Sequence, residues 1–223
     1  MYTAIIVEPR CHKALSFVLE NFTSNLSDEW SFIIFHGNKN IEFILTIINT
    51  KLVAHKNRIQ LVNLGVDNLS SDDYNNLFKY NKDFYQHIPT ETFLVFQTDT
   101  IIFGKHKDLI NNFLKYDYVG APWGCQFREN LTVGNGGLSL RKKSKMLEII
   151  EKEGENDDPE DVYFSDPKNV PIFKPPKHEA MFFSVEQIFN PISFGCHKPW
   201  SGSSHLRHVH EEARILFELN DVY

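Results

Sequence analysis

The first hundred residues alternate between short apolar runs and segments whose apolar residues recur at helical spacing. The apolar runs are rich in β-branched and aromatic residues, and they predict buried strands at residues 2–7, 30–35, 58–64 and 92–96. The segments between them predict helices at residues 12–24, 40–53 and 70–80, the last capped by Ser70. Strands and helices that alternate over short loops predict a mostly parallel sheet with right-handed crossovers, so the fold class is α/β.

The second half of the chain is less regular. Its pattern predicts a helix at 106–115, a short strand and turn at 118–123, a flexible turn at 134–137 that leads to residues 138–141, a helix at 142–152, a late strand at 192–194 and a tail helix from about 205 to 219. Residues 154–178 are acidic and then rich in proline, which predicts an excursion over the surface.

Composition and charge exclude several classes of protein. The 223 residues carry a formal net charge of −6, which argues against a nucleic-acid partner because binding to phosphate backbones needs a basic surface. No apolar run is long enough to span a membrane, and the first residues lack the basic region of a signal peptide. The three cysteines form neither a disulfide framework nor a metal-ligand spacing. We therefore expect one domain, residues 1–223, in the cytoplasm.

Polar residues follow three of the predicted strands. These are Glu8-Pro9-Arg10, His36-Gly37-Asn38 and Gln97-Thr98-Asp99. Ligands bind at the carboxyl ends of the strands in parallel sheets, so we expect a site at this edge. Asp99 directly follows an apolar strand, where a carboxylate can hold Mg²⁺ or Mn²⁺ while a diphosphate supplies further oxygens. A turn-capping role for Asp99 fits the spacing equally well.

Three further segments could carry chemistry. Glu160 and Asp161 begin a short predicted helix, where one carboxylate could be a general base or both could simply favour the helix dipole. The glycines of 134–137 allow close backbone approach to a ligand or form an ordinary hairpin. His197 could bind a metal ion and Lys198 a phosphate, or both could lie in a solvated turn. His205, His208 and His210 lack partners at a zinc-like spacing and predict a polar helix face.

Several short motifs in the sequence match a known family, both in their residues and in their order along the chain. They are Val7-Glu8-Pro9-Arg10, Phe96-Gln97-Thr98-Asp99-Thr100, residues 116–123 (YDYVGAPW), residues 133–141 (VGNGGLSLR), residues 159–165 (PEDVYFS) and residues 194–200 (FGCHKPW). The chain thereby resembles a family of GT-A glycosyltransferases found in large DNA viruses, of the chlorovirus and mimivirus type, and in some cellular genomes. The resemblance implies a GT-A fold: a Rossmann-like central sheet flanked by helices, with a nucleotide-binding half at 1–100 and a donor-sugar and acceptor half at 101–223.

The resemblance also implies roles for single residues. Gln97-Thr98-Asp99 is similar to the Asp-x-Asp motif that binds Mn²⁺ and the nucleotide diphosphate. Gln97 stands where that motif has its first Asp, which leaves Asp99 as the carboxylate ligand. The segment Val7-Glu8-Pro9-Arg10 lies where such enzymes seat the base and ribose, with Arg10 facing the phosphates.

The later strings are assigned in the same way. The ending Gly195-x-x-Lys198-Pro199-Trp200 is similar to that of glycogenin-like transferases, where the Lys contacts the diphosphate. A metal-binding His in those enzymes stands where this chain has Ile192, and His197 is the local substitute. Residues 160–162 are similar to the Glu-Asp-Val motif of inverting transferases, in which an acidic residue is the base. Asn135, Gly136 and Gly137 would line the donor sugar or acceptor.

The resemblance implies a glycosyltransferase that uses Mn²⁺ or Mg²⁺ and moves a sugar, from a UDP-sugar by preference, to a glycan or protein acceptor. Three alternatives remain. A decayed GT-A module that binds a nucleotide or carbohydrate without turnover would explain Gln97. A sugar-nucleotide pyrophosphorylase would need a basic, glycine-rich loop in place of residues 8–12. A purely structural protein would leave the polar strand ends unexplained. The Lys-Pro-Trp ending occurs in retaining enzymes, so the stereochemistry also stays open.

Overall fold

The computed structural model describes residues 1–124, 132–201 and 209–222. Its main sheet has six strands in the order β3-β2-β1-β4-β7-β6. They are β1 (Tyr2–Val7), β2 (Trp30–His36), β3 (Ile59–Asn63), β4 (Thr92–Phe96), β6 (Tyr118–Val119) and β7 (Leu138–Lys142). The first four are parallel, and β7 runs antiparallel to both β4 and β6. This arrangement confirms the predicted mostly parallel sheet.

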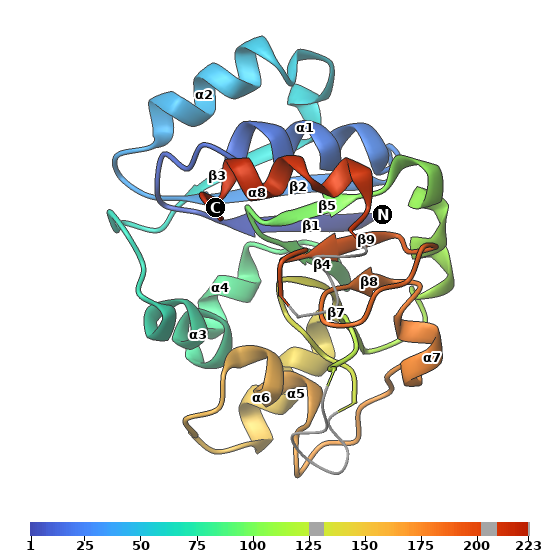
Figure 1. The fold of residues 1–223 in the computed structure, drawn as a ribbon. Helices are drawn as coiled ribbons and strands as arrows, with labels where there is room; N and C mark the ends of the chain where they lie inside the picture. Colours follow the sequence, from blue (N-terminus) through green and yellow to red (C-terminus); the bar gives the residue numbers. More distant parts are fainter. Residues whose placement is uncertain (125–131, 202–208, 223) are drawn as a thin grey trace.

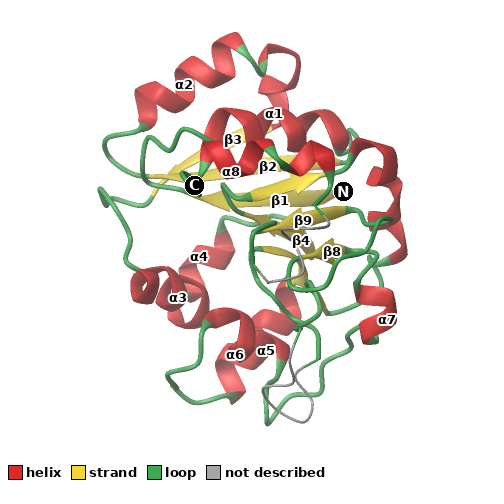
Figure 2. Cartoon of the chain, viewed as in Figure 1, coloured by secondary structure: helices red, strands yellow, loops and turns green. Residues whose placement is uncertain are grey.

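Helices cover both faces of the main sheet, as Figures 1 and 2 show. One face carries α1 (Leu15–Asn25), α2 (Ile41–Thr50) and α8 (Ile215–Leu219); the other carries α3 (Ser71–Tyr80), α4 (Lys82–Gln86), α5 (Lys143–Lys152) and α6 (Glu160–Ser165). Shorter elements are α7 (Lys177–Ala180) and the 3₁₀ helices η1 (Val53–Arg58), η2 (Gly104–Asn112) and η3 (Glu211–Ala213). None of the helices in the described ranges is both long and apolar enough to cross a membrane.

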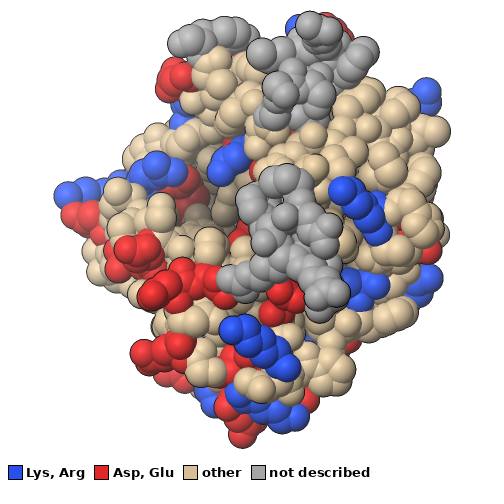
Figure 3. Space-filling view, turned by 60° about the horizontal axis from the view of Figure 1, so that its bottom comes forward, with Lys and Arg blue, Asp and Glu red and all other residues tan. Residues whose placement is uncertain are grey.

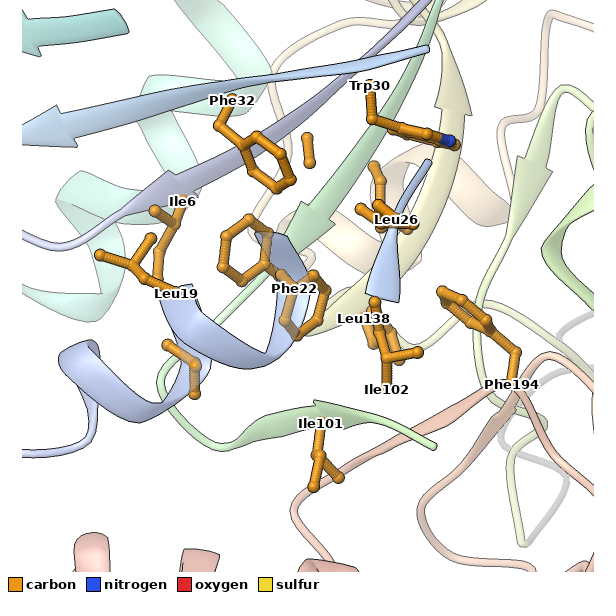
Figure 4. Close-up of a cluster of buried hydrophobic side chains, with 14 of the residues drawn as sticks. Ile6, Leu19, Phe22, Leu26, Trp30, Phe32, Ile101, Ile102, Leu138 and Phe194 are labelled. Carbon is orange, nitrogen blue, oxygen red and sulfur yellow. The ribbon is translucent and has the colours of Figure 1, made fainter. Parts of the chain in front are cut away.

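Alternate residues of the buried strands serve opposite faces of the sheet, because successive side chains of a strand point to opposite sides. Ile6 and Phe96 pack toward α1, whereas Ile5 and Val95 pack toward α3 to α6. Figure 4 shows part of the apolar cluster on the α1 side of the sheet, including Ile6 and Phe22. In this cluster the rings of Phe22 and Phe96 stack with centroids 4.0 Å apart. Because both faces of the sheet are buried, nearly every residue of these strands is apolar, and the strands appear in the sequence as continuous apolar runs.

A second, three-stranded sheet lies beside the main one. Its order is β5-β9-β8, formed by β5 (Thr100–Ile102), β8 (Ser184–Val185) and β9 (Gly195–His197). The sequence pattern predicts a strand at 192–194, three residues before β9, and gives no sign of β5 or β8. Strands of two or three residues are too short to show a period of two. This small sheet matters because it carries His197 into the site.

Three other predictions need correction. The helix expected at 106–115 is the 3₁₀ helix η2 at Gly104–Asn112. Residues 154–178 do not form a surface excursion throughout, because α6 buries Tyr163 and Phe164 against the core. The tail helix is shorter than expected: α8 covers Ile215–Leu219, and residues 205–208 of the predicted span lie outside the described residues.

A candidate active site at the carboxyl ends of the strands

A cavity of about 440 Å³ opens at the carboxyl ends of β1 and β4. Its walls come from the loops after these strands, the starts of α3 and α6, the segment before β7 and the end of β9. All of the site residues predicted from the sequence line this cavity: Val7, Glu8, Arg10, Thr98, Asp99, Asn135, Gly136, Gly137, Glu160, Asp161, His197 and Lys198. The fold therefore gathers in one place side chains that are far apart along the chain.

The loop after β1 is fixed by a buried amide. The side chain of Asn40 donates hydrogen bonds to the carbonyl oxygens of Glu8 (2.8 Å) and Arg10 (3.0 Å). The buried Glu8 carboxylate accepts from two guanidinium nitrogens of Arg10, each at 2.8 Å. These bonds to Glu8 raise the pKa of Arg10, so the guanidinium stays charged. Glu8 also neutralises part of that charge, which tempers the predicted role of Arg10 toward phosphates.

Asp99 and His197 meet through the pairing of the small sheet. Thr100 lies opposite His197 in the β5–β9 register, so the preceding Asp99 comes next to the imidazole. Asp99 Oδ1 is 3.3 Å from His197 Nε2, and Glu186 Oε2 is 3.3 Å from His197 Nδ1. Burial lowers the pKa of His197, but the two carboxylates outweigh it and raise the pKa to about 10. Burial raises the pKa of Asp99, but His197 outweighs it and holds the pKa below its usual value.

The Asp99–His197 pair fits part of a divalent metal site. Asp99 Oδ1 and His197 Nε2 are buried and make no hydrogen bond of good geometry within the described residues. A carboxylate oxygen and an imidazole nitrogen are suitable ligands for Mn²⁺, and the metal ion would replace the proton on Nε2. Within the described ranges, no group of three or more His, Cys, Asp or Glu could hold a metal ion. Two protein ligands suffice where substrate phosphates supply further oxygens, as is common for Mg²⁺.

Gly136 and Gly137 lie between α6 and the Asp99–His197 pair. A Cβ on Gly136 would lie 2.4 Å from Glu160 Oε1, and a Cβ on Gly137 would lie 2.2–2.4 Å from three ring atoms of His197. These nearly equal distances place Gly137 against the face of the imidazole, whereas Asp99 and Glu186 face its two nitrogens. The Asn135 side chain accepts a hydrogen bond from the Gly137 N–H at 3.1 Å. Residues 135–137 therefore form the wall between α6 and His197.

The two carboxylates of α6 have different environments. Glu160 is buried and accepts hydrogen bonds from Arg141 Nη1 (2.7 Å) and Nη2 (3.0 Å). Asp161 accepts from the backbone N–H groups of Gly136 (3.3 Å) and Val162 (2.8 Å). Burial, and then the nearby Glu160, raise the pKa of Asp161 to about 6. Of the two, Asp161 is therefore the carboxylate suited to gain and lose a proton near neutral pH.

Gln97 and Lys198 complete the centre of the cavity. Gln97 does not contact Asp99 by any hydrogen bond among the described residues; its amide donates to Tyr74 Oη at 2.9 Å. Lys198 is exposed and adopts a φ of 42°, unusual for a residue other than glycine, while its N–H donates to the Asp99 carbonyl oxygen at 3.1 Å. Backbone strain of this kind is concentrated at functional sites.

Several residues of this site are not among those predicted from the sequence. Asn68, Leu69, Ser70, Ser71, Tyr74 and Asn75 line the cavity from the start of α3. Ser70 was predicted only as a helix cap, and it does form a capping box with Asp73. Arg141 contacts Glu160 and Glu186 contacts His197, and both partners lie more than ten positions away in the sequence. No local sequence pattern therefore predicts either role. His210, considered for zinc, instead stacks on Phe103 with centroids 4.0 Å apart; His205 and His208 lie outside the described residues.

Comparison with protein families gives one match. The family described as "Protein of unknown function (DUF5672)" matches residues 58–197. The chain belongs to this family. The DUF5672 segment contains Asp99, residues 135–137, the α6 carboxylates and His197, whereas Glu8, Arg10 and Lys198 lie outside it. A search of the curated proteins found no match to the sequence.

Solved structures identify the fold of this DUF5672 protein. An active-site mutant of LgtC is 11% identical, with a TM-score of 0.54 over 99% of this chain and 95% of that one. The glycosyltransferase GlyE of Streptococcus pneumoniae TIGR4 is 14% identical, with a TM-score of 0.53 over 97% of this chain. This chain spans 59% of the GlyE chain. At such identities the similarity establishes the fold, which is the GT-A fold of glycosyltransferases.

Proposed function

We propose that this protein is a metal-dependent glycosyltransferase that moves a sugar from a nucleotide sugar, a UDP-sugar by preference, to a glycan or protein acceptor. One observation carries the proposal. A single cavity at the strand ends is lined both by the buried Asp99–His197 pair and by Asp161, whose pKa is raised to about 6. The GT-A fold adds weight, because GlyE, which shares it, is a glycosyltransferase.

The donor would occupy the half of the cavity under β1 and β4. Val7, Glu8 and Arg10 would seat the base and ribose, with Thr98 beside the diphosphate. Asp99 and His197 would hold Mn²⁺ or Mg²⁺, which supplies positive charge to the leaving diphosphate. Lys198 and Arg10 would add to that charge where negative charge develops. Asn135, Gly136 and Gly137 would line the donor sugar or the acceptor.

The acceptor hydroxyl would be activated by Asp161. Its carboxylate takes the proton while the hydroxyl oxygen forms a bond to the anomeric carbon. The bond from that carbon to the phosphate oxygen breaks, and its electron pair leaves with the diphosphate. Glu160 is also predicted as catalytic, but its carboxylate accepts two hydrogen bonds from Arg141. We therefore propose that Glu160 orients α6 and Gly136 and does not act as the base. This scheme describes inversion at the anomeric carbon.

The remaining predictions concern organisation and setting. We propose that residues 1–223 act as one GT-A domain, with donor binding in 1–100 and sugar and acceptor binding in 101–223. We also propose that it works in the cytoplasm, that of the host if the chain is virus-encoded. The face shown in Figure 3 carries basic and acidic side chains side by side, which favours a nucleotide sugar over a nucleic acid as partner.

Asp99 gives the sharpest test of the metal site. Replacing Asp99 by asparagine is expected to weaken Mn²⁺-dependent binding of UDP at least about 100-fold, because loss of a direct ligand costs more than the 10–100-fold typical of a supporting residue. Binding of UDP is measured by calorimetry with and without Mn²⁺. Asp28→Asn is the matched control, since the Asp28 side chain is fully exposed and lies outside the cavity lining. Unchanged Mn²⁺-dependent affinity in Asp99→Asn would exclude Asp99 as a ligand.

A further inference from the structure

Glu186 is a buried carboxylate that the proposed reaction does not use. It is 5% exposed and follows directly after β8. The parallel pairing of β8 with β9 matches Val185 with Cys196, so the next pair in register is Glu186 and His197. Glu186 Oε2 makes no hydrogen bond of good geometry within the described residues and lies 3.3 Å from His197 Nδ1. A buried carboxylate is costly unless a partner compensates it, and His197 is the partner within reach.

The imidazole of His197 is enclosed from three directions. β9 is the middle strand of the small sheet, with β5 on one side and β8 on the other. Asp99, just before β5, faces Nε2, and Glu186, just after β8, faces Nδ1. Gly137 covers the ring face. Asp99 lines the cavity, whereas Glu186 lines a separate small hollow beside Phe189 and Cys196. The two nitrogens therefore face different surroundings.

We propose that Glu186 is a positioning residue for the metal site. Its carboxylate accepts the Nδ1–H of His197 and so fixes the tautomer whose Nε2 lone pair points toward Asp99. In a neutral imidazole one nitrogen carries the proton and the other is the ligand, so a partner at Nδ1 selects Nε2 for the metal ion. The inference rests on the proposed function, because it assigns Glu186 to the Mn²⁺ site formed by Asp99 and His197.

The first experiment measures metal affinity rather than turnover. Binding of Mn²⁺ in the presence of saturating UDP is followed by electron paramagnetic resonance of the free ion. Glu186→Gln, which keeps the shape and removes the charge, is expected to weaken Mn²⁺ binding about 10–100-fold. Binding of UDP without metal is expected to stay as in the wild type. Glu179→Gln is the matched control, because the Glu179 carboxylate accepts a hydrogen bond from Tyr116 Oη at 2.7 Å and lies outside the cavity lining.

The second experiment needs no variant of Glu186 and so stands even if Glu186→Gln fails to fold. Histidine ¹⁵N labelling, with His197 assigned by its loss in His197→Gln, reports which ring nitrogen carries the proton in the Mg²⁺–UDP complex. We expect a proton on Nδ1. Wild-type Mn²⁺ affinity in Glu186→Gln would overturn the role of Glu186 alone. A proton on Nε2 in this complex would overturn both that role and His197 as a ligand, because a protonated Nε2 cannot bind the metal ion. Absence of Mn²⁺ binding in the wild type would instead overturn the proposed metal site itself.

Discussion

Replacing Asp161 by asparagine is expected to lower the rate of sugar transfer by about 10²–10⁴-fold, the usual contribution of a general base. Asparagine keeps one of the two carboxylate oxygens and can still accept from the Val162 N–H at the start of α6, while the longer hydrogen bond from the Gly136 N–H to the other oxygen is lost. It has no basic site for the proton of the acceptor hydroxyl. Transfer is measured as release of UDP from the donor sugar, with water or the acceptor taking the sugar. The affinity for the donor is expected to be unchanged.

The pH dependence of the transfer rate tests whether Asp161 is the general base. A base acts in its ionised form, and burial raises the pKa of Asp161 to about 6. The wild-type rate is therefore expected to rise as the pH increases through about 6 and to level off above it, and this step should vanish in Asp161→Asn. Asp157→Asn, an exposed residue just before α6, is the control. A normal rate in Asp161→Asn would place the base elsewhere or indicate a retaining mechanism.

Replacing Arg141 by methionine is expected to lower the free energy of unfolding by about 3–5 kcal/mol, the range found when one partner of a buried ion pair is removed. Arg141 is fully buried and bonds Glu160 through two nitrogens. Its guanidinium also lies over the rings of Phe78, Tyr118 and Phe164, at 5.2, 5.0 and 5.7 Å from their centroids. Methionine would leave the Glu160 carboxylate buried without a counter-charge. Urea denaturation measures the loss.

A second variant separates loss of the charge pair from loss of packing. Arg141→Met combined with Glu160→Leu removes both charges, and the double variant is expected to recover most of the lost stability. Transfer activity is not expected to recover with it, because Arg141 also reaches the Gly136 carbonyl oxygen at 3.4 Å and so supports the wall beside Asp161. A loss below about 1 kcal/mol in Arg141→Met, the range of exposed ion pairs, would contradict the role of this pair.

The main sheet could be predicted from the sequence because its parallel strands are five to seven residues long and separated by clear helical patterns. The residues at the strand ends could be predicted for the same reason, since parallel strands bring their carboxyl ends to one edge. The small sheet could not be predicted, because β8 and β9 have only two and three residues. The burial of Tyr163 and Phe164 was missed because prolines dominate the flanking sequence.

The supporting residues of the site lay beyond sequence reasoning for a different reason. Asn40 holds the loop at Glu8, thirty-two positions away, and Glu186 meets Asp99 only through His197 between them. Arg141 lies near the end of β7 next to Lys142, and this pair of basic residues gives no local sign that Arg141 is buried. Such roles depend on contacts across the fold. The motif segments contain the residues that face the cavity. They also contain Arg141, but they indicate no role for it, and Asn40 and Glu186 lie outside all of them.

The measurement that tests the central claim most directly is thermal unfolding of the wild-type protein with a panel of nucleotides and nucleotide sugars, with and without Mn²⁺. A ligand at about 100 times its dissociation constant stabilises the folded state by roughly 2.7 kcal/mol. For a chain of this size the midpoint would rise by about 5–10 °C. We predict such a rise for UDP compounds only when Mn²⁺ is present. No rise with any nucleotide, with or without Mn²⁺, would contradict the proposal of a nucleotide-sugar site in this cavity.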